Sequence, residues 1–264
     1  SLQTAAGCLF FIARENGGKF LVILSNNALP GNFKGSEVSL DESKAKVCEL
    51  TNENCDALRE LFPFTKPKNH QAIEITVGLG DRLGLASPGH IRLIKDLPVF
   101  PILAQQSIRE LNLTSRTYPD VLAAASWAVF QEGYTKGFGA DGDHLKTAEE
   151  VQMALDCGFT MITLDCSEHI DNPVAALSAD EIADRYQKLP QDIRAKLEGK
   201  YLGKTFDLKG VSLTFNQADF QKIVLVYLKA INYTIDLYNN LIKNYNRKID
   251  FEMSIDETLT STSP

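Results

Sequence analysis

Residues 159–169 read FTMITLDCSEH, a short apolar run followed at once by a cluster of polar side chains. Four other segments contain similar apolar runs, at 73–77, 99–103, 138–140 and 251–255. Segments with helical periodicity lie between them, at 88–95, 117–136 and 147–157. Because strands that alternate with helices build βαβ units, the pattern predicts an α/β fold with five parallel strands that are neighbours in chain order.

Polar residues follow each of the five runs. They are Gly80-Asp81-Arg82, Gln105-Gln106-Ser107 with Arg109, and the segments 141–146, 165–169 and 256–258. Since the carboxyl ends of parallel strands lie at one face of a sheet, we expect these residues to converge there, as in a (β/α)8 barrel. A barrel of this kind closes with eight strands, so we expect a TIM-barrel-like fold that is truncated after about five.

The remaining segments suggest the domain organisation. Residues 1–70 contain a hairpin signal at Glu15-Asn16-Gly17-Gly18 and a helix over 52–61, which predicts a small α+β appendage. Residues 71–264 would then form the partial barrel, interrupted by an insertion at 171–248. That insertion contains a second hairpin signal at Lys209-Gly210 and an amphipathic helix within 217–245.

The composition excludes several classes of protein. The chain has 264 residues, a formal net charge of −7 and 44% hydrophobic residues, which is typical of a globular protein. It has no basic run for nucleic acid and no apolar stretch of the roughly 20 residues that cross a membrane. The five cysteines form no CxxC pair, so we interpret them as reduced thiols of a cytoplasmic protein.

Two glycine-rich stretches invite a nucleotide-binding interpretation. Residues 78–84 have one residue too many for the dinucleotide fingerprint, and residues 137–142 follow a predicted helix rather than a strand. Each stretch also carries an aspartate, Asp81 or Asp141, which would repel a pyrophosphate. We therefore expect no nucleotide cofactor.

The segment 141–146 has the side chains for metal binding and proton transfer. Asp141, Asp143, His144 and Lys146 lie within six positions, although a solvated loop would have the same composition. A second cluster with Asp165, Glu168 and His169 favours the functional interpretation, because His and carboxylate side chains bind Zn²⁺, Mn²⁺ or Fe²⁺.

Cationic side chains follow the same runs and suggest an anionic substrate. Arg82, Arg109 and Lys146 are suited to a carboxylate, although internal ion pairs with Asp81, Glu110 or Glu149 would explain them equally well.

Six segments resemble the tagaturonate epimerase family. They are 80–84 (GDRLG), 104–110 (AQQSIRE), 125–134 (ASWAVFQEGY), 137–146 (GFGADGDHLK), 159–169 and 251–258 (FEMSIDET). The resemblance implies a TIM-barrel-like enzyme of hexuronate catabolism that uses a divalent metal, with Zn, Mn, Ni and Fe all open, to interconvert tagaturonate and fructuronate. It also implies that this chain corresponds to the N-terminal portion of the family.

The two keto acids differ at a carbinol carbon β to the ketone, so enolisation alone cannot invert it. Retro-aldol cleavage and re-addition can, and transient oxidation by a nicotinamide is the rival. We expect catalytic roles for Asp143, His144, Lys146 and Asp165, and metal binding by His144 and Glu257. Substrate contacts are expected from Arg82, Gln106, Arg109 and His169.

Two other functions stay open. The chain could be a catalytically incomplete fragment that binds a sugar acid, or it could belong to a related metal-dependent aldolase or ketose isomerase. In each case the expected partner is a small anionic sugar acid. The exposed edge of the last strand, 251–255, also predicts a homo-oligomer, unless the helix within 217–245 or the N-terminal appendage covers it.

Overall fold

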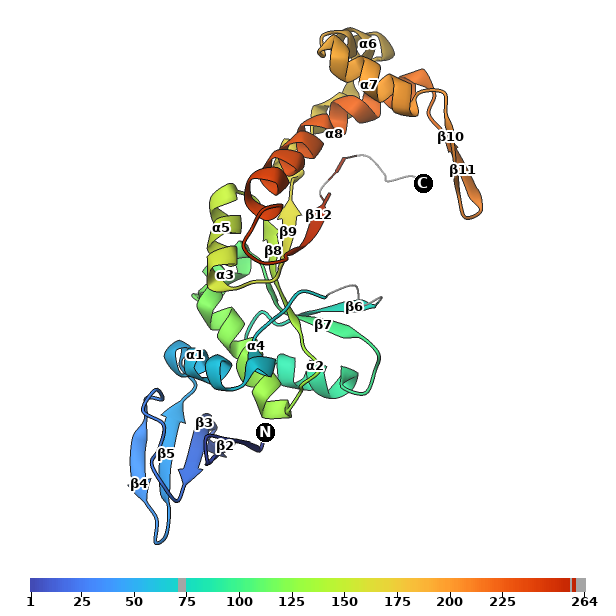
Figure 1. The fold of residues 1–264 in the computed structure, drawn as a ribbon. Helices are drawn as coiled ribbons and strands as arrows, with labels where there is room; N and C mark the ends of the chain where they lie inside the picture. Colours follow the sequence, from blue (N-terminus) through green and yellow to red (C-terminus); the bar gives the residue numbers. More distant parts are fainter. Residues whose placement is uncertain (71–74, 257, 260–264) are drawn as a thin grey trace. The chain divides into compact units, whose positions relative to one another are not determined.

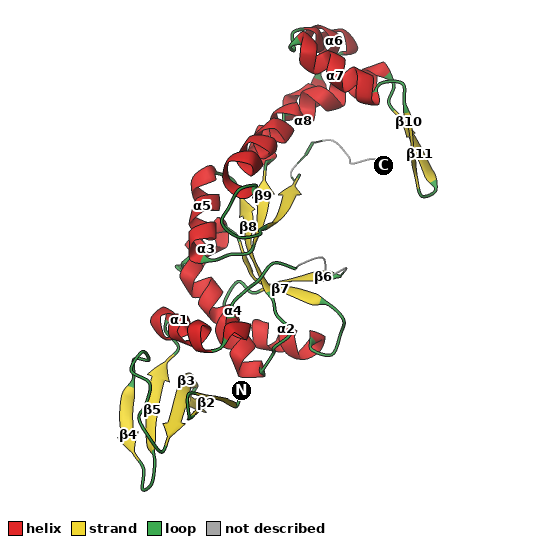
Figure 2. Ribbon diagram, viewed as in Figure 1, coloured by secondary structure: helices red, strands yellow, loops and turns green. Residues whose placement is uncertain are grey.

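The structure, a computed structural model, describes residues 1–70, 75–256 and 258–259. It is a mixed α/β fold with two five-stranded sheets, shown in Figures 1 and 2. Clustering of the chain gives two compact units, one of residues 1–163 with 245–252 and the other of residues 164–244 with 253–264. The boundary between the units passes through two strands of the second sheet.

The N-terminal sheet is antiparallel. Its strands, in spatial order, are β1 (Gln3–Ala5), β2 (Cys8–Glu15), β3 (Gly18–Ser25), β5 (Lys44–Glu49) and β4 (Ser36–Ser39). Glu15 pairs with Gly18 around Asn16 and Gly17, which have φ values of +49° and +83°. The expected hairpin is confirmed, because Asn and Gly tolerate the positive φ angles of its two-residue turn.

Helix α1 (Asn52–Leu61) follows this sheet, as predicted. The Thr51 side chain caps it by accepting a hydrogen bond from the Asn54 backbone N–H at 3.2 Å. The buried face of the helix shares a hydrophobic core with the sheet and with α4 (Tyr118–Glu132), and Phe10, Leu58 and Trp127 are among its members. Residues 1–70 therefore pack on part of the second sheet's helical layer within one unit. The expected domain boundary at residue 70 stays a prediction, since a compact unit need not be an independent domain.

The second sheet contains the five predicted strands in the predicted order. They are β6 (Thr76–Gly80), β7 (Phe100–Gln106), β8 (Gly139–Leu145), β9 (Met161–Asp165) and β12 (Asp250–Ser254), arranged β12-β9-β8-β7-β6. The β6–β7 and β7–β8 pairs are parallel. Residues 71–74, where the first run was expected to begin, lie outside the described residues.

Three helices between the strands are confirmed with small changes of boundary. They are α2 (Ser87–Ile94), α4 and α5 (Ala148–Cys157). Helix α4 was expected to reach residue 136, but it ends at Glu132 because Gly133 takes a left-handed conformation with φ +61° and closes the last turn. Helix α3 (Ile108–Thr114) was not predicted.

The segment 141–146 differs from its expected form. We expected a loop after the third strand, whereas β8 continues to Leu145. Asp141 and Gly142 are fully or almost fully buried, so polar residues continue the strand instead of ending it. The reason is that the Asp141 side chain bonds to residues of both neighbouring strands, which compensates its burial in part.

The second unit contains the insertion. Its elements are α6 (Ala179–Gln187), α7 (Gln191–Tyr201), β10 (Thr205–Leu208), β11 (Val211–Thr214) and α8 (Gln217–Leu237). The hairpin of β10 and β11 around Lys209-Gly210 and the amphipathic helix are confirmed. Residues of α8 such as Val226 and Ala230 pack with Cys166 and Val174 in a separate core.

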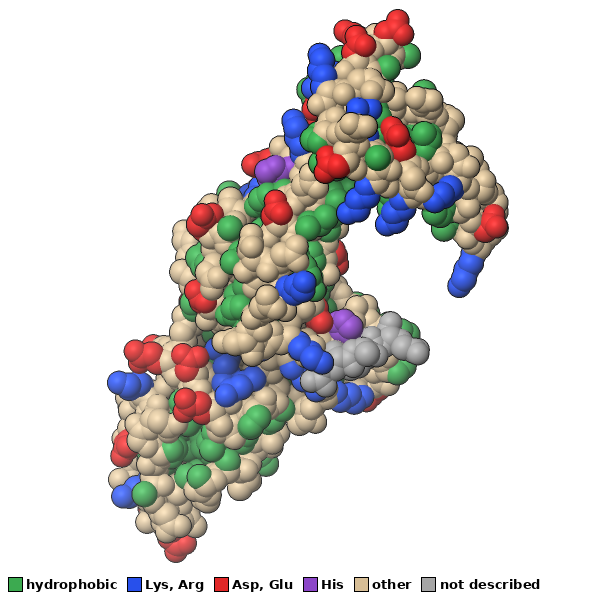
Figure 3. All heavy atoms as spheres, turned by 45° about the horizontal axis from the view of Figure 1, so that its top comes forward, with side chains coloured by type: hydrophobic (Ala, Val, Ile, Leu, Met, Phe, Trp, Pro, Cys, Tyr) green, Lys and Arg blue, Asp and Glu red, His purple; other side chains and the backbone are tan. Residues whose placement is uncertain are grey.

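Charged side chains of both signs are interspersed on the face of the molecule drawn in Figure 3. Among the described residues, no helix has the length and apolar character needed to cross a bilayer. All five cysteines are free in the structure.

Candidate functional site

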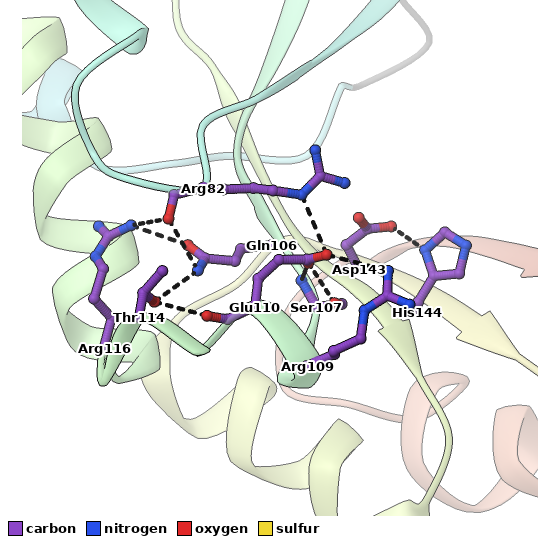
Figure 4. Close-up of polar contacts among 9 residues, drawn as sticks. All are labelled: Arg82, Gln106, Ser107, Arg109, Glu110, Thr114, Arg116, Asp143 and His144. Carbon is purple, nitrogen blue, oxygen red and sulfur yellow. Dashed lines mark hydrogen bonds and ion pairs between the residues drawn. The ribbon is translucent and has the colours of Figure 1, made fainter. Parts of the chain in front are cut away.

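The carboxyl ends of β6, β7 and β8 lie in the first unit and carry the polar residues that were predicted to converge. These three strands are adjacent, and α3 packs against β8. Figure 4 draws nine of the side chains at these ends and their polar contacts.

The loop after β6 is ordered by Asp81. Its carboxylate accepts hydrogen bonds from the backbone N–H groups of Leu85 (2.9 Å) and Ser87 (2.8 Å), and from the Ser87 hydroxyl (2.7 Å). Burial disfavours the charged form, but these hydrogen bonds outweigh it and lower the pKa of Asp81. Asp81 thus fixes the loop that presents Arg82.

The end of β7 departs from regular strand geometry. The register with β8 shifts between Leu103 and Gln106, and Ala104 has φ +56°. The Gln106 side chain is fully buried, and its Oε1 accepts a hydrogen bond from Arg116 Nη1 at 3.0 Å. Its Nε2 donates to the Arg82 carbonyl at 3.3 Å and to the Thr114 hydroxyl at 3.4 Å. The amide therefore joins the Arg82 loop to the segment that connects α3 with α4.

Glu110 contacts the guanidinium groups of both Arg82 and Arg109. Ser107 and Glu110 form a capping box at the start of α3, with the Ser107 N–H donating to Glu110 Oε2 at 2.9 Å. The other oxygen, Oε1, lies 3.2 Å from Arg82 Nε and 3.4 Å from Arg109 Nη2. Burial opposes ionisation, but the contacts with Ser107 and Arg82 lower the pKa of Glu110 to about 2.

The two arginines stay largely accessible despite this contact. The side chains of Arg82 and Arg109 are 63% and 81% exposed, whereas that of Glu110 is 10% exposed. The internal ion pair that we considered as an alternative is therefore present, and it aligns two exposed guanidinium groups on one buried carboxylate. Exposed guanidinium groups of this kind can bind a carboxylate or phosphate.

The end of β8 carries a carboxylate–imidazole pair. His144 Nδ1 lies 2.7 Å from Asp143 Oδ1, and the Asp143 side chain is 13% exposed while that of His144 is 40% exposed. When Asp143 accepts the Nδ1–H, the lone pair of the neutral ring is on Nε2, where it can accept a proton or bind a metal. The Lys146 backbone N–H donates to Glu150 Oε2 at 2.7 Å and so begins the turn into α5.

Asp141 is the most deeply buried carboxyl among these residues, with no exposed surface. Its Oδ2 accepts hydrogen bonds from the Thr163 hydroxyl at 2.9 Å and from Gln105 Nε2 at 3.4 Å. Burial, together with the nearby Asp143 carboxylate, raises the pKa of Asp141 to about 7. This perturbation marks Asp141 as a residue of interest. The sequence had placed it in the 141–146 cluster without a role of its own.

Asp165 and His169 belong to the second unit and are described within it. Asp165 Oδ1 accepts a hydrogen bond from the Ser167 backbone N–H at 2.9 Å. The His169 ring stacks on Tyr233, with ring centroids 3.9 Å apart. Glu257, a predicted metal ligand, lies outside the described residues.

The donors around His144 do not complete a metal site by themselves. Across residues 1–70, 75–256 and 258–259, no group of three or more His, Cys, Asp or Glu side chains is placed to hold an ion. The Asp143–His144 pair has the carboxylate partner typical of a metal-bound histidine, but it provides at most one nitrogen donor and its own carboxylate.

The structure thus brings together Arg82, Gln106, Arg109, Asp143 and His144 at adjacent strand ends. Glu110 and Arg116 were not predicted as site residues, and Asp141 was considered in the 141–146 cluster but was given no role. A signal for Glu110 was present, because Ser107 and Glu110 have the S-x-x-E spacing of a capping box. To assign Asp141 a role from the sequence, we would have had to predict 139–145 as a strand whose side chains alternate between two faces. No local signal pointed to Arg116.

Comparison with known proteins gives consistent results. The profile of the UxaE tagaturonate epimerase family matches residues 1–264. A tagaturonate/fructuronate epimerase of Thermotoga maritima is 38% identical over 255 residues, which is 97% of this chain and 52% of that protein.

Solved structures of the fructuronate-tagaturonate epimerase UxaE from Cohnella laeviribosi are also similar. The native crystal structure and a glycerol complex each have a TM-score of 0.92 and 46% identity, and each comparison covers 98% of this chain and 52% of the other. The chain therefore spans about half the length of the relatives that it matches.

Proposed function

We propose, from the premise that this chain belongs to the tagaturonate epimerase family, that its protein is an isomerase that interconverts tagaturonate and fructuronate in hexuronate catabolism. The observation that supports this proposal most strongly is the family match over residues 1–264, together with relatives that carry that name. The accessible arginines and the carboxylate–imidazole pair at neighbouring strand ends agree with an anionic sugar acid as substrate.

The fold in this proposal is TIM-barrel-like. The proposal is supported by five strands in consecutive spatial order, with the parallel pairs β6–β7 and β7–β8. The proposed active site lies at the carboxyl ends of the strands, where barrel enzymes place their catalytic residues. A cytoplasmic location and a homo-oligomer belong to the same proposal.

In this proposal Arg82 and Arg109 bind the carboxylate of the substrate, and Asp143 and His144 move a proton. His144 Nε2 takes the proton of the hydroxyl at the carbon to be inverted, while Asp143 holds the Nδ1–H and stabilises the imidazolium. As the hydroxyl becomes an aldehyde, the C–C bond to the α carbon breaks and its electron pair forms an enolate. Re-addition to the other face of the aldehyde, with return of the proton from His144, gives the epimer.

The remaining predicted residues keep their proposed roles. Gln106 would contact the substrate only after exchanging its present hydrogen bonds. The catalytic roles of Lys146 and Asp165 and the substrate contact of His169 remain predictions from the sequence. A divalent metal is still part of the proposal, with His144 and Glu257 as the expected ligands. Since the described donors are too few, additional ligands would have to lie outside the described residues. Nε2 of His144 can serve as base or as ligand, but not as both at once.

The direct test is to incubate the complete gene product with tagaturonate and with Zn²⁺, Mn²⁺, Ni²⁺ or Fe²⁺ in turn. Formation of fructuronate, followed by NMR, would support the proposal. If no fructuronate forms with any of the metals, the epimerase function is rejected. Release of two shorter carbon fragments would instead indicate an aldolase, and migration of the carbonyl would indicate a ketose isomerase.

A second candidate function is that residues 1–264 bind a sugar acid without converting it. It is favoured by the chain's coverage of 52% of its relatives and by the small number of metal donors among residues 1–70, 75–256 and 258–259. Calorimetry of residues 1–264 with hexuronates, with and without metal, distinguishes the two functions. Heat of binding without turnover would support this second candidate.

A further inference from the structure

A layer of polar side chains crosses the second sheet below the strand ends. Gln105 on β7, Asp141 on β8 and Thr163 on β9 are linked through Asp141 Oδ2, at 3.4 Å and 2.9 Å. Gly78 on β6 continues the layer, because a Cβ there would lie 2.9 Å from Gln105 Oε1. Layers inside (β/α) barrels are usually filled by branched aliphatic residues, so a polar layer at this level requires an explanation.

Asp141 lies at the centre of this layer, where its surroundings disfavour the ionised carboxylate. Its side chain is fully buried, and Oδ1 has no hydrogen-bond partner among the described residues. The charged groups that act on it are carboxylates, Asp143 on its own strand and Glu252 on β12. Another titratable group nearby, among the described residues, is the phenol of Tyr118 on α4, which is itself buried. A buried carboxylate without a cation costs several kcal/mol, which binding a proton avoids.

Asp141 and Asp143 lie two positions apart on β8, where side chains share a face. A second carboxyl this close makes a charge on the fully buried Asp141 still less favourable.

We propose that Asp141 is a positioning residue whose buried carboxyl is kept uncharged between Gln105 and Thr163, where it joins β7, β8 and β9 beneath the candidate site. This inference rests on the proposed function for its catalytic consequence. The protonation state of Asp141 itself can be measured without substrate. The raised pKa of Asp141 noted above agrees with this state but is not its basis.

The first experiment compares Asp141→Asn with the complete wild-type gene product and with a control variant, Asp96→Asn, at an exposed position. Infrared spectroscopy at pH 5–6 would show a protonated carboxyl band in the wild type and in the control, and its loss in Asp141→Asn. Thermal unfolding gives a second readout. The pKa of Asp141 is 3.8 in the unfolded chain and about 7 in the folded protein, so its contribution to stability is lost as pH rises between these values. Over this pH range the wild type should therefore lose stability relative to Asp141→Asn.

The second experiment measures turnover. Asp141→Leu removes the oxygen that accepts from Thr163 and Gln105, and we expect kcat to fall about tenfold or more with KM within about threefold. Asp141→Asn keeps a neutral group with an acceptor oxygen, so it should restore most of this loss. If Asp141→Asn does not fold, Thr163→Val, which removes the stronger hydrogen bond, should raise the pH at which the infrared band disappears.

The proposal is overturned if the wild type lacks the carboxyl band at pH 5–6, or if Asp141→Asn is as inactive as Asp141→Leu. Either result would mean that Asp141 is ionised and paired with a cation that the described residues do not provide. If the protein has no epimerase activity, the infrared and unfolding readouts still decide the state of Asp141. Failure of the proposed function is therefore recognised separately.

Discussion

Asp143 and His144 are consecutive residues of β8, yet Oδ1 of the first lies 2.7 Å from Nδ1 of the second. Neighbouring side chains of a strand normally point to opposite faces of the sheet. Here His144 has φ +54°, in the left-handed region, and this turn accompanies the contact of its ring with the preceding carboxylate. Strained backbone of this kind is found preferentially at functional sites, which agrees with the proposed role of the pair.

We expect His144→Ala, in the complete gene product, to lower turnover at least about a hundredfold while leaving the fold intact, since loss of a proton-transfer group or ligand typically costs that much. Initial rates of fructuronate formation and circular dichroism would measure the two effects. His144→Asn should lose as much activity, because Asn tolerates a left-handed backbone and removes only the chemistry. The bound metal content of each variant would show whether Nε2 serves as ligand or as base.

The matched control for this experiment is His70→Ala. His70 lies before β6, and its Nε2 is 3.4 Å from Asp250 Oδ1 in the same unit. We expect its turnover to stay near wild type. Equal losses in the His70 and His144 variants would show that the catalytic end of the sheet was chosen wrongly.

Glu110→Gln should destabilise the protein at neutral pH. The carboxylate holds Arg82 and the Ser107 N–H, and hydrogen bonds to a buried charge are worth about 1–3 kcal/mol. Because the pKa of Glu110 is lowered from 4.5 to about 2, its stabilising contribution is complete above about pH 4.5 and is lost as pH falls toward 2. The difference between wild type and variant in urea unfolding should shrink over that window. Glu60→Gln, at an exposed position of α1, should show no such difference.

Gly84→Ala should destabilise the loop after β6 by about 1–3 kcal/mol. Gly84 has φ +71°, and an added Cβ would lie 2.9 Å from Arg116 Nη2, the guanidinium that also binds Gln106. Gly89→Ala is the contrasting change, because an added Cβ meets no atom within 4 Å and Ala favours the helix by about 0.5–1 kcal/mol. Opposite shifts in melting temperature are expected, and shifts of the same sign would contradict this account of the loop.

Residues 1–264, expressed by themselves, should protect the edge of β12 by self-association or by burial within the chain. β12 is an outer strand of its sheet, and exposed strand edges pair with other chains. Light scattering and hydrogen exchange over 250–256 would test this expectation. A monodisperse monomer whose amides at 250–256 exchange freely would contradict it.

Local sequence signals predicted most of the secondary structure. The hairpin at Asn16-Gly17, the helix over 52–61 and the order of the five strands of the second sheet all followed from turn chemistry, helix-end signals and hydrophobic periodicity. Such features depend on residues close together in the chain. The positions of Arg82, Gln106 and His144 at adjacent strand ends then followed from the rule that parallel strands share a carboxyl edge.

The contacts within the candidate site depended on tertiary structure. Glu110 was a possible partner of Arg82 in the sequence, but only the packing of α3 beside the β6 loop places it between two arginines. Likewise, the aspartates of 141–146 resemble a solvated loop, because polar composition alone does not reveal that a strand continues through them. The hydrogen-bond partners of Asp141 are Gln105 and Thr163, which are 36 and 22 residues away in the chain. The sequence by itself thus determined the elements and their order, whereas burial and long-range contacts decided which side chains meet at the candidate site.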